Sequence, residues 1–153
     1  MDHPCAWGEY TAEQAAELEE FCNGYRAFIS ENKTERECAA SAIKRAEAAG
    51  YISLDSAIAS GEALKPGDKI YASNRGKTIA LVHLGTEPLE RGLNILGAHI
   101  DCPRLDIKQN PLEEKNDLAF LDTNYYGGVK KYQWVTLPLA IHGVIAKKQI
   151  LAV

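Results

Sequence analysis

An almost unbroken apolar run at residues 94–100, which reads NILGAHI, constrains the fold more than any other segment of this chain. Apolar runs of this length without polar alternation are typical of strands that are buried on both faces. Strands of this kind occur in sheets that are covered by helices. The run therefore predicts an α/β fold with this segment as one of its buried strands.

Two helices are expected before this run. Thr11 and Gln14 have the spacing of a capping box, and Thr34 and Glu37 repeat that spacing further along the chain. Apolar residues at helical intervals follow the first box, and an alanine-rich stretch follows the second. Gly50 stands where the second helix should end in a glycine cap. We expect the alanine-rich face to pack closely on a sheet.

Shorter strands are expected between the second helix and the apolar run. Residues 69–73 and 78–84 have strand-like patterns, and they are separated by an Asn-Arg-Gly turn at residues 74–76. Residues 51–67 read as irregular. Together with residues 94–100, these segments predict a mixed sheet.

The composition changes after Pro103, and we place a domain boundary near Ile107. Residues 1–107 are then part of an α/β domain, and residues 108–153 begin a second, β-rich region. That region should end in a hairpin formed by residues 136–146 and 149–153. Because its last residues are apolar and strand-like, we expect the chain to be part of a longer protein or to need a partner strand.

The overall composition excludes several classes of protein. The formal net charge of −4 argues against a nucleic-acid-binding protein. No apolar run reaches the roughly 18 residues needed to span a membrane. The N-terminus lacks the basic start and apolar core of a signal peptide, so a cytoplasmic location is expected. The four cysteines form no CxxC pair and are expected to be reduced thiols.

The strongest chemical pattern is His99-Ile100-Asp101 at the end of the predicted buried strand. In an extended segment, His99 and Asp101 point to the same side. A neutral imidazole is a good zinc ligand, and a carboxylate two residues away can orient it. The spacing alone also fits a histidine and an aspartate that are simply hydrogen-bonded at a strand end. That structural interpretation is the commoner one for an isolated H-x-D.

Other candidate residues carry weaker signals. Cys102 follows the H-x-D pattern, but a buried structural thiol is favoured over a nucleophile. His83 and His142 lie in strand-like patterns and are expected to be structural, and His3 lies near the N-terminus. Residues 125–128, Tyr-Tyr-Gly-Gly, either line a pocket or form a glycine turn beside core aromatic residues.

Several segments together resemble the aspartyl aminopeptidase and vacuolar aminopeptidase I family. Residues 97–105, GAHIDCPRL, are similar to its G-[AS]-H-x-D-[SC]-P-x-L segment. Residues 125–134, YYGGVKKYQW, resemble its Y-G-G…W segment, and residues 138–144 resemble the stretch that follows. Residues 69–75 are more loosely similar to a segment upstream. The order and approximate spacing of these segments agree with the family along most of the chain.

This resemblance implies a two-zinc aminopeptidase that releases N-terminal residues from peptides. His99 would ligate one zinc ion, and Asp101 would be the catalytic-site residue that holds His99 in position. The region after Ile107 would begin an inserted dimerisation domain, in a protein that forms homo-oligomers from dimers to dodecamers. The other metal ligands would lie beyond Val153, so zinc is expected to be absent or only partly held by this chain. Asn124-Tyr125 and the absent arginine after Gly143 depart from the family pattern, so a preference for acidic residues is not carried over from the family to this chain.

Two alternatives stay open at this point. The chain is either the metal-bearing part of an enzyme or a non-catalytic fragment or homologue that serves as an assembly or interaction module. A third hypothesis is a small hydrolase that uses Cys102, and it requires that Cys102→Ala abolish activity.

Overall fold

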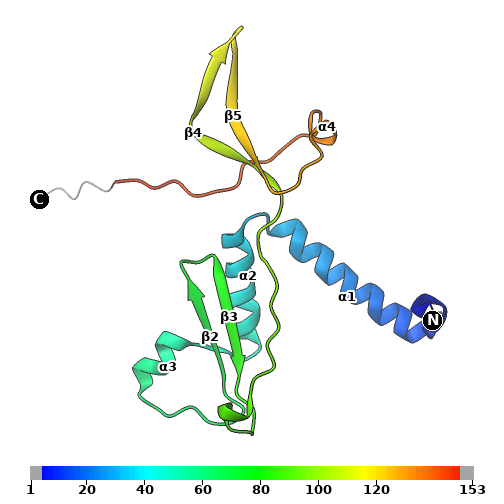
Figure 1. Ribbon diagram of the computed structural model, residues 1–153, viewed down its shortest axis with the longest axis vertical. Helices are drawn as coiled ribbons and strands as arrows, with labels where there is room; N and C mark the ends of the chain where they lie inside the picture. The colour runs from blue at the N-terminus through cyan, green and yellow to red at the C-terminus, as the bar shows by residue number, and fades with distance from the viewer. Residues whose placement is uncertain (1–4, 149–153) are drawn as a thin grey trace, which may run out of the picture. The chain divides into compact units, whose positions relative to one another are not determined.

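The computed structural model describes residues 5–148. The chain forms two compact units, Met1–Asn94 and Ile95–Val153, and Figure 1 shows their secondary structure. The first unit holds the longer helices and a three-stranded sheet, whereas the second is built around a β-hairpin.

The first unit begins with a short 3-10 helix, η1 (Ala6–Gly8), and the helices α1 (Ala12–Glu31) and α2 (Glu35–Ala48). Both predicted capping boxes are confirmed. The Gln14 backbone N–H donates to the Thr11 hydroxyl, and the Thr11 N–H donates to the Gln14 side chain. Thr34 and Glu37 make the same reciprocal pair. These bonds satisfy N–H groups that have no partner within the helix, which explains why the helices begin where they do.

The sheet has the strand order β1-β2-β3, with β1 (Ile52–Ser53) parallel to β2 (Lys69–Asn74) and β3 (Thr78–His83) antiparallel to β2. The two longer strands confirm the sequence prediction, as does the turn between them. Arg75 and Gly76 have φ of 54° and 64°, and the Lys77 N–H closes the turn on the Asn74 carbonyl at 3.0 Å.

The expectation that residues 51–67 are irregular is wrong, because this segment contains β1 and the helix α3 (Leu54–Ser60). The Ser53 hydroxyl caps α3 by accepting from the Ser56 N–H at 3.1 Å, and Gly61 ends the helix with a φ of 68°. A serine before an apolar stretch and a glycine after it are the helix signals that sequence reasoning overlooked here.

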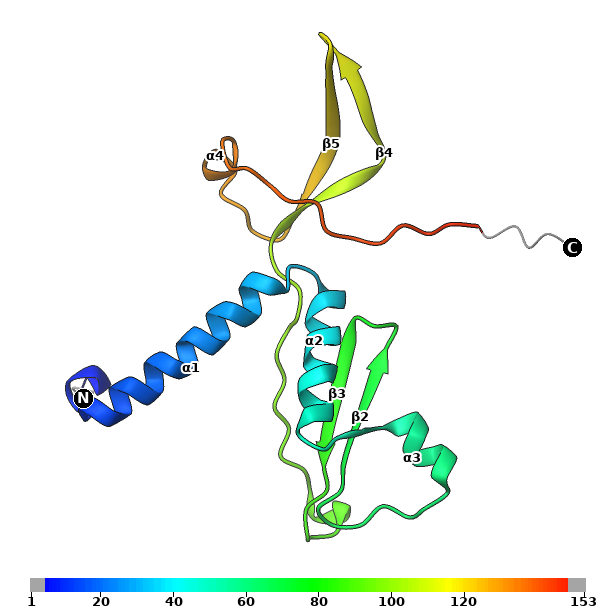
Figure 2. The same cartoon turned by 180° about the vertical axis from the view of Figure 1, so that it is seen from behind.

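Helix α2 packs against β2 and β3, and the two ribbon views agree on this arrangement (Figures 1 and 2). Among the described residues, the buried side chains are three alanines, Ala39 and Ala46 on α2 and Ala57 on α3. Ala39 and Ala46 lie two turns apart on one face of the helix. The predicted packing of an alanine-rich helix face on a sheet is therefore confirmed, as is the α/β class with a mixed sheet.

The second unit contains a long antiparallel hairpin, β4 (Arg104–Lys115) and β5 (Leu118–Tyr126), and a short helix α4 (Lys131–Trp134). The register shifts between Ile107 and Leu112, which marks a bulge. Asn116 and Asp117 connect the strands with φ of 55° and 59°, the two left-handed residues of a tight hairpin turn. The position near Ile107, where we place the domain boundary, lies inside β4, whereas the compact units divide between Asn94 and Ile95.

The prediction of a buried strand at residues 94–100 is wrong for this structure. The segment has no regular secondary structure, and Ile95 and Leu96 are 82% and 101% exposed. A strand exists only where neighbouring backbone supplies hydrogen-bond partners, and no segment among residues 5–148 pairs with this one. The apolar side chains of this segment favour burial, but Ile95 and Leu96 stay exposed in the described part of the chain.

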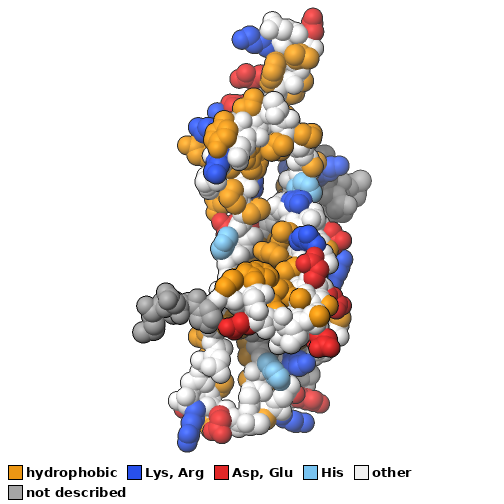
Figure 3. All heavy atoms as spheres, turned by 90° about the vertical axis from the view of Figure 1, so that its right-hand side faces the viewer, with side chains coloured by type: hydrophobic (Ala, Val, Ile, Leu, Met, Phe, Trp, Pro, Cys, Tyr) orange, Lys and Arg blue, Asp and Glu red, His pale blue; other side chains and the backbone are white. Residues whose placement is uncertain are grey.

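The predicted strand at residues 136–146 is also wrong, since these residues have no regular structure. Its expected partner at residues 149–153 lies outside the described residues. Many other large apolar side chains reach the surface, as Figure 3 shows for one face of the molecule. No helix in residues 5–148 is long and apolar enough to cross a membrane.

Candidate metal site at the H-x-D segment

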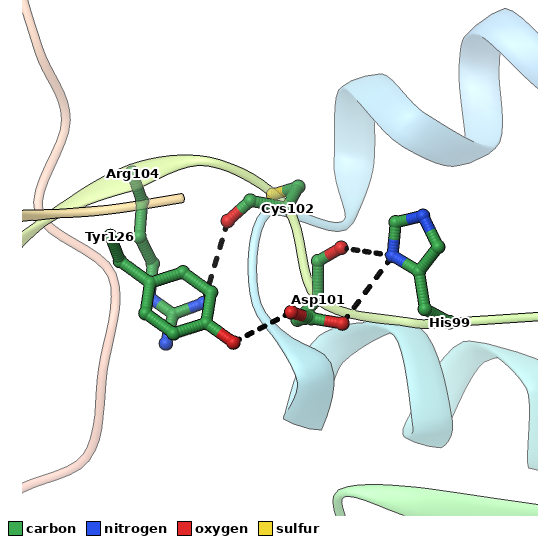
Figure 4. A network of polar contacts seen from close by, with 5 residues as sticks. All are labelled: His99, Asp101, Cys102, Arg104 and Tyr126. Atoms are coloured by element: carbon green, nitrogen blue, oxygen red, sulfur yellow. Dashed lines mark hydrogen bonds and ion pairs between the residues drawn. The ribbon is translucent and has the colours of Figure 1, made fainter. Parts of the chain in front are cut away.

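His99 and Asp101 lie in the second unit, on the extended segment that leads into β4. The His99 Nδ1 atom faces Asp101 and lies 2.7 Å from its backbone carbonyl oxygen and 3.3 Å from its carboxylate Oδ1 (Figure 4). A carbonyl oxygen can only accept a hydrogen bond, so Nδ1 must carry the proton. In the neutral imidazole, the lone pair then lies on Nε2, which is the arrangement needed for a metal ligand.

The carboxylate of Asp101 is held from its other side by Tyr126. The Tyr126 hydroxyl donates to Asp101 Oδ2 at 2.7 Å (Figure 4). This hydrogen bond is the main reason that the pKa of Asp101 lies below its usual value, with smaller contributions from its own backbone N–H and from His99. These hydrogen bonds and the attraction of His99 favour the ionised carboxylate. The ionised form accepts from Tyr126 and attracts the His99 N–H.

Arg104 lies against the face of Tyr126, with its guanidinium carbon 4.2 Å from the ring centroid. The two residues are register partners at the base of the β4–β5 hairpin. Arg104 also donates through Nε to Asp106 at 2.8 Å and lies 3.5 Å from the Cys102 carbonyl oxygen through Nη1. The hairpin thus fixes Tyr126 beside the H-x-D segment.

Gly127 allows the chain to pass close to Pro103. Its φ is 71°, and a Cβ placed there would lie 3.4 Å from the Pro103 Cα and Cγ atoms. Left-handed backbone of this kind favours glycine. Two segments that the sequence singled out separately, residues 97–105 and 125–128, therefore meet in the fold. Sequence reasoning pointed to the second segment but gave Tyr126 no role, since its link to Asp101 spans 25 residues.

The H-x-D segment can supply one ligand, His99, to a zinc site that needs several. His99 offers a suitably oriented imidazole, but its side chain is 82% exposed. Within the described residues, no group of three or more His, Cys, Asp or Glu side chains could hold a metal ion. Protein zinc sites generally need three or four protein ligands, so this segment alone forms only one part of such a site.

The other sequence candidates lie apart from these contacts. His83 ends β3 opposite Lys69, so the prediction that it lies in a strand is confirmed. His142 is not in a strand, contrary to prediction, because residues 135–148 have no regular structure. Cys102 is exposed rather than buried, contrary to the structural-thiol expectation, and contributes its carbonyl oxygen to Arg104. His3 lies outside the described residues.

Comparison with known proteins supplies the context for this geometry. The family model described as "Aminopeptidase I zinc metalloprotease (M18)" matches residues 28–151. A probable M18 family aminopeptidase 1 of Clostridium acetobutylicum is 58% identical over 143 residues, which is 94% of this chain and 31% of that protein.

Solved structures agree with the sequence matches. The crystal structure of aminopeptidase I from Clostridium acetobutylicum has a TM-score of 0.80 at 56% identity, over 97% of this chain and 32% of that one. Aminopeptidase I from Borrelia burgdorferi B31 has a TM-score of 0.79 at 42% identity, over 86% of this chain and 32% of that one.

The sequence and structure matches thus place this chain in the class of metallopeptidases. More specifically, the chain belongs to the aminopeptidase I zinc metalloprotease (M18) family. The chain spans about 30% of the length of the relatives it matches.

Proposed function

We propose that this chain supplies the H-x-D part of the active site of a zinc aminopeptidase that acts on peptides with a free N-terminus. The observation that carries the proposal is the orientation of His99. Its Nδ1 lies 2.7 Å from the backbone carbonyl oxygen of Asp101, so that Nε2 is available to a metal ion. Membership of a zinc metalloprotease family supports it independently.

In this proposal His99 is a zinc ligand, and Asp101 is the residue that keeps its imidazole in the metal-binding tautomer. Asp101 is suited to that role because its carboxylate and its carbonyl oxygen both face Nδ1. A zinc ion, when bound, would polarise the scissile carbonyl and activate a water molecule for attack. The remaining ligands must come from beyond the described residues or from another chain.

We further propose that the chain contains parts of two domains, of which residues 1–107 belong to the catalytic domain. Residues 108–153 would begin a β-rich domain through which the protein forms homo-oligomers. The exposed apolar side chains of the hairpin, including Leu112, Leu118 and Phe120, support a surface that is covered in an assembly. Sedimentation of the complete gene product tests this, because a strictly monomeric protein would contradict it.

We place the protein in the cytoplasm, in keeping with the free thiols Cys5 and Cys22.

The decisive test is His99→Ala in the complete gene product that contains this chain. We expect loss of peptidase activity and of about one zinc ion per subunit, measured by emission spectroscopy. His83→Ala is the matched control, because His83 lies in β3 and should leave zinc content unchanged. Retained activity with His99→Ala would overturn the assignment. Equal cleavage of N-acetylated and free peptides would show that the enzyme is not an aminopeptidase.

A further inference from the structure

Tyr126, the last residue of β5, reaches Asp101 from 25 residues further along the chain. Its hydroxyl donates to Asp101 Oδ2 at 2.7 Å, while Asp101 Oδ1 lies 3.3 Å from His99 Nδ1. The two carboxylate oxygens thus have different partners on opposite sides. Figure 4 shows the three side chains in line, with Asp101 between the phenol and the imidazole.

A carboxylate between two such partners cannot rotate freely without losing one of them. The Cα–Cβ and Cβ–Cγ bonds of an aspartate otherwise allow its oxygens to turn away from a neighbouring imidazole. Charge-assisted hydrogen bonds to a carboxylate are among the stronger ones in proteins. The Tyr126 hydroxyl therefore limits the positions that Asp101 Oδ1 can take relative to His99.

Tyr126 is itself held in place by the hairpin. It is the last residue of β5 and pairs with Arg104 at the start of β4. The Arg104 guanidinium covers the ring face at 4.2 Å and is anchored to Asp106. Gly127 then turns the chain beside Pro103. A rigid strand end thereby supports a segment that has no regular structure of its own.

We propose that Tyr126 is a positioning residue of the zinc site, which acts on the metal through Asp101 and His99. This inference rests on the proposed function of His99 as a zinc ligand. Residues that orient a metal ligand typically change metal affinity 10–100-fold when they are altered. Because Tyr126 acts one step further away, we expect an effect of about tenfold, at the low end of that range.

Tyr125 provides a matched control one residue away. Its ring faces Lys131, whose Nζ lies 4.3 Å from the ring centroid. Successive side chains of a strand point to opposite faces, so Tyr125 should not share the role of Tyr126. Both tyrosines are about half exposed, so removal of either hydroxyl perturbs the fold to a similar degree.

The experiment measures zinc affinity of the complete gene product by competition with a chromophoric chelator. Tyr126→Phe should weaken zinc binding about tenfold, whereas Tyr125→Phe should leave it unchanged. Phenylalanine keeps the ring that stacks on Arg104, and circular dichroism checks that the variant folds. As a second variant, Arg104→Met keeps the hydroxyl but removes the stacked guanidinium, and it should produce a smaller loss. Unchanged zinc affinity in Tyr126→Phe would overturn the proposal.

A double-mutant cycle separates positioning from general structural damage. If Tyr126 acts through Asp101, Tyr126→Phe should have no further effect on zinc affinity in an Asp101→Ala background. Additive losses would reject the positioning role. His99→Ala tests the underlying function separately: if it leaves zinc binding intact, the proposed site is wrong. If His99→Ala abolishes zinc binding while Tyr126→Phe is neutral, only the role of Tyr126 fails.

Discussion

The two units of this chain differ in how much of each is specified by contacts between residues that are close in sequence. In the unit Met1–Asn94, helices begin at capping boxes that join residues three apart, and β2 and β3 are joined by a tight turn. In the unit Ile95–Val153, the contact that orders the H-x-D segment joins Asp101 to Tyr126. Local rules therefore account for the helix starts and the β2–β3 turn of the first unit, but not for the Asp101–Tyr126 contact at the candidate site.

The difference also extends to burial. The buried side chains of residues 5–148 all belong to α2 and α3 of the first unit. In the second unit, Ile95, Leu96 and Ile145 are almost fully exposed. The first unit therefore has the beginnings of a core, whereas the second relies on hairpin hydrogen bonds and on polar contacts around Tyr126.

The largest effect is expected at the helix–sheet contact of the first unit. Ala39→Leu places extra methylene groups in a fully buried position and should destabilise this unit by about 1–3 kcal/mol. Hydrogen exchange of α2 and β3 amides measures the effect. Ala40→Leu is the control, because Ala40 is exposed on the same helix. Equal effects of the two variants would show that Ala39 does not pack against the sheet.

A somewhat smaller effect is expected at the hairpin turn of the second unit. Asn116→Val places a β-branched residue at a φ of 55° and should cost about 1–2 kcal/mol. Hydrogen exchange should show lower protection of β4 and β5 amides and no change in β2 and β3. Asn116→Gly accepts this φ and should be nearly neutral. Loss of protection in both units would contradict their separation.

Removal of one helix cap should have a moderate effect that is confined to the first unit. Thr34→Ala removes the hydroxyl that accepts from the Glu37 N–H at 3.3 Å, and we expect a loss of about 1 kcal/mol. Thr34→Ser keeps the acceptor and should restore most of the stability. The thermal unfolding midpoint measures both variants, and identical midpoints for Thr34→Ala and the parent chain would rule out the cap's contribution.

The smallest effects are expected from changes of pH. The first unit should lose stability at high pH, and the second unit should lose stability at low pH. Tyr71 donates to Glu47 at 2.7 Å, which raises the pKa of Tyr71 above its usual value. A raised folded-state pKa contributes stability below the unfolded value, and this contribution is lost as pH rises through the folded value. The first unit should therefore weaken in alkali, and Tyr71→Phe should remove this dependence.

In the second unit, the 2.7 Å hydrogen bond from Lys108, with a smaller contribution from its positive charge, lowers the pKa of Asp122. A lowered folded-state pKa contributes stability above the unfolded value, and this contribution is lost as pH falls through the folded value. The protection factors of the β4 and β5 amides, which are corrected for the intrinsic pH dependence of exchange, should therefore fall in acid, and less so with Asp122→Asn. The reverse pattern, with the first unit weakened by acid and the second by alkali, would contradict both assignments.

Much of the first unit could be predicted because its signals act over a few residues. Thr11, Thr34 and Gly50 marked helix ends that the structure contains, and the turn at Arg75-Gly76 was recognised from its residue types. The two-residue turn at Asn116-Asp117 had an equally local signal, and so did the Ser53 cap, but both were overlooked. Asn and Asp tolerate left-handed backbone and Ser favours helix N-caps, so the local sequence does specify both features.

By itself, the sequence determined the helix starts and ends, the two longer strands of the sheet and the segments that carry the family resemblance. Each depends on residue types within a short window, where steric preference and capping act directly. Only the tertiary structure decided that Tyr126 contacts Asp101 and that residues 94–100 pair with no other segment of residues 5–148. Both depend on which distant backbone lies alongside, and strand pairing across many residues leaves no local pattern from which it can be read.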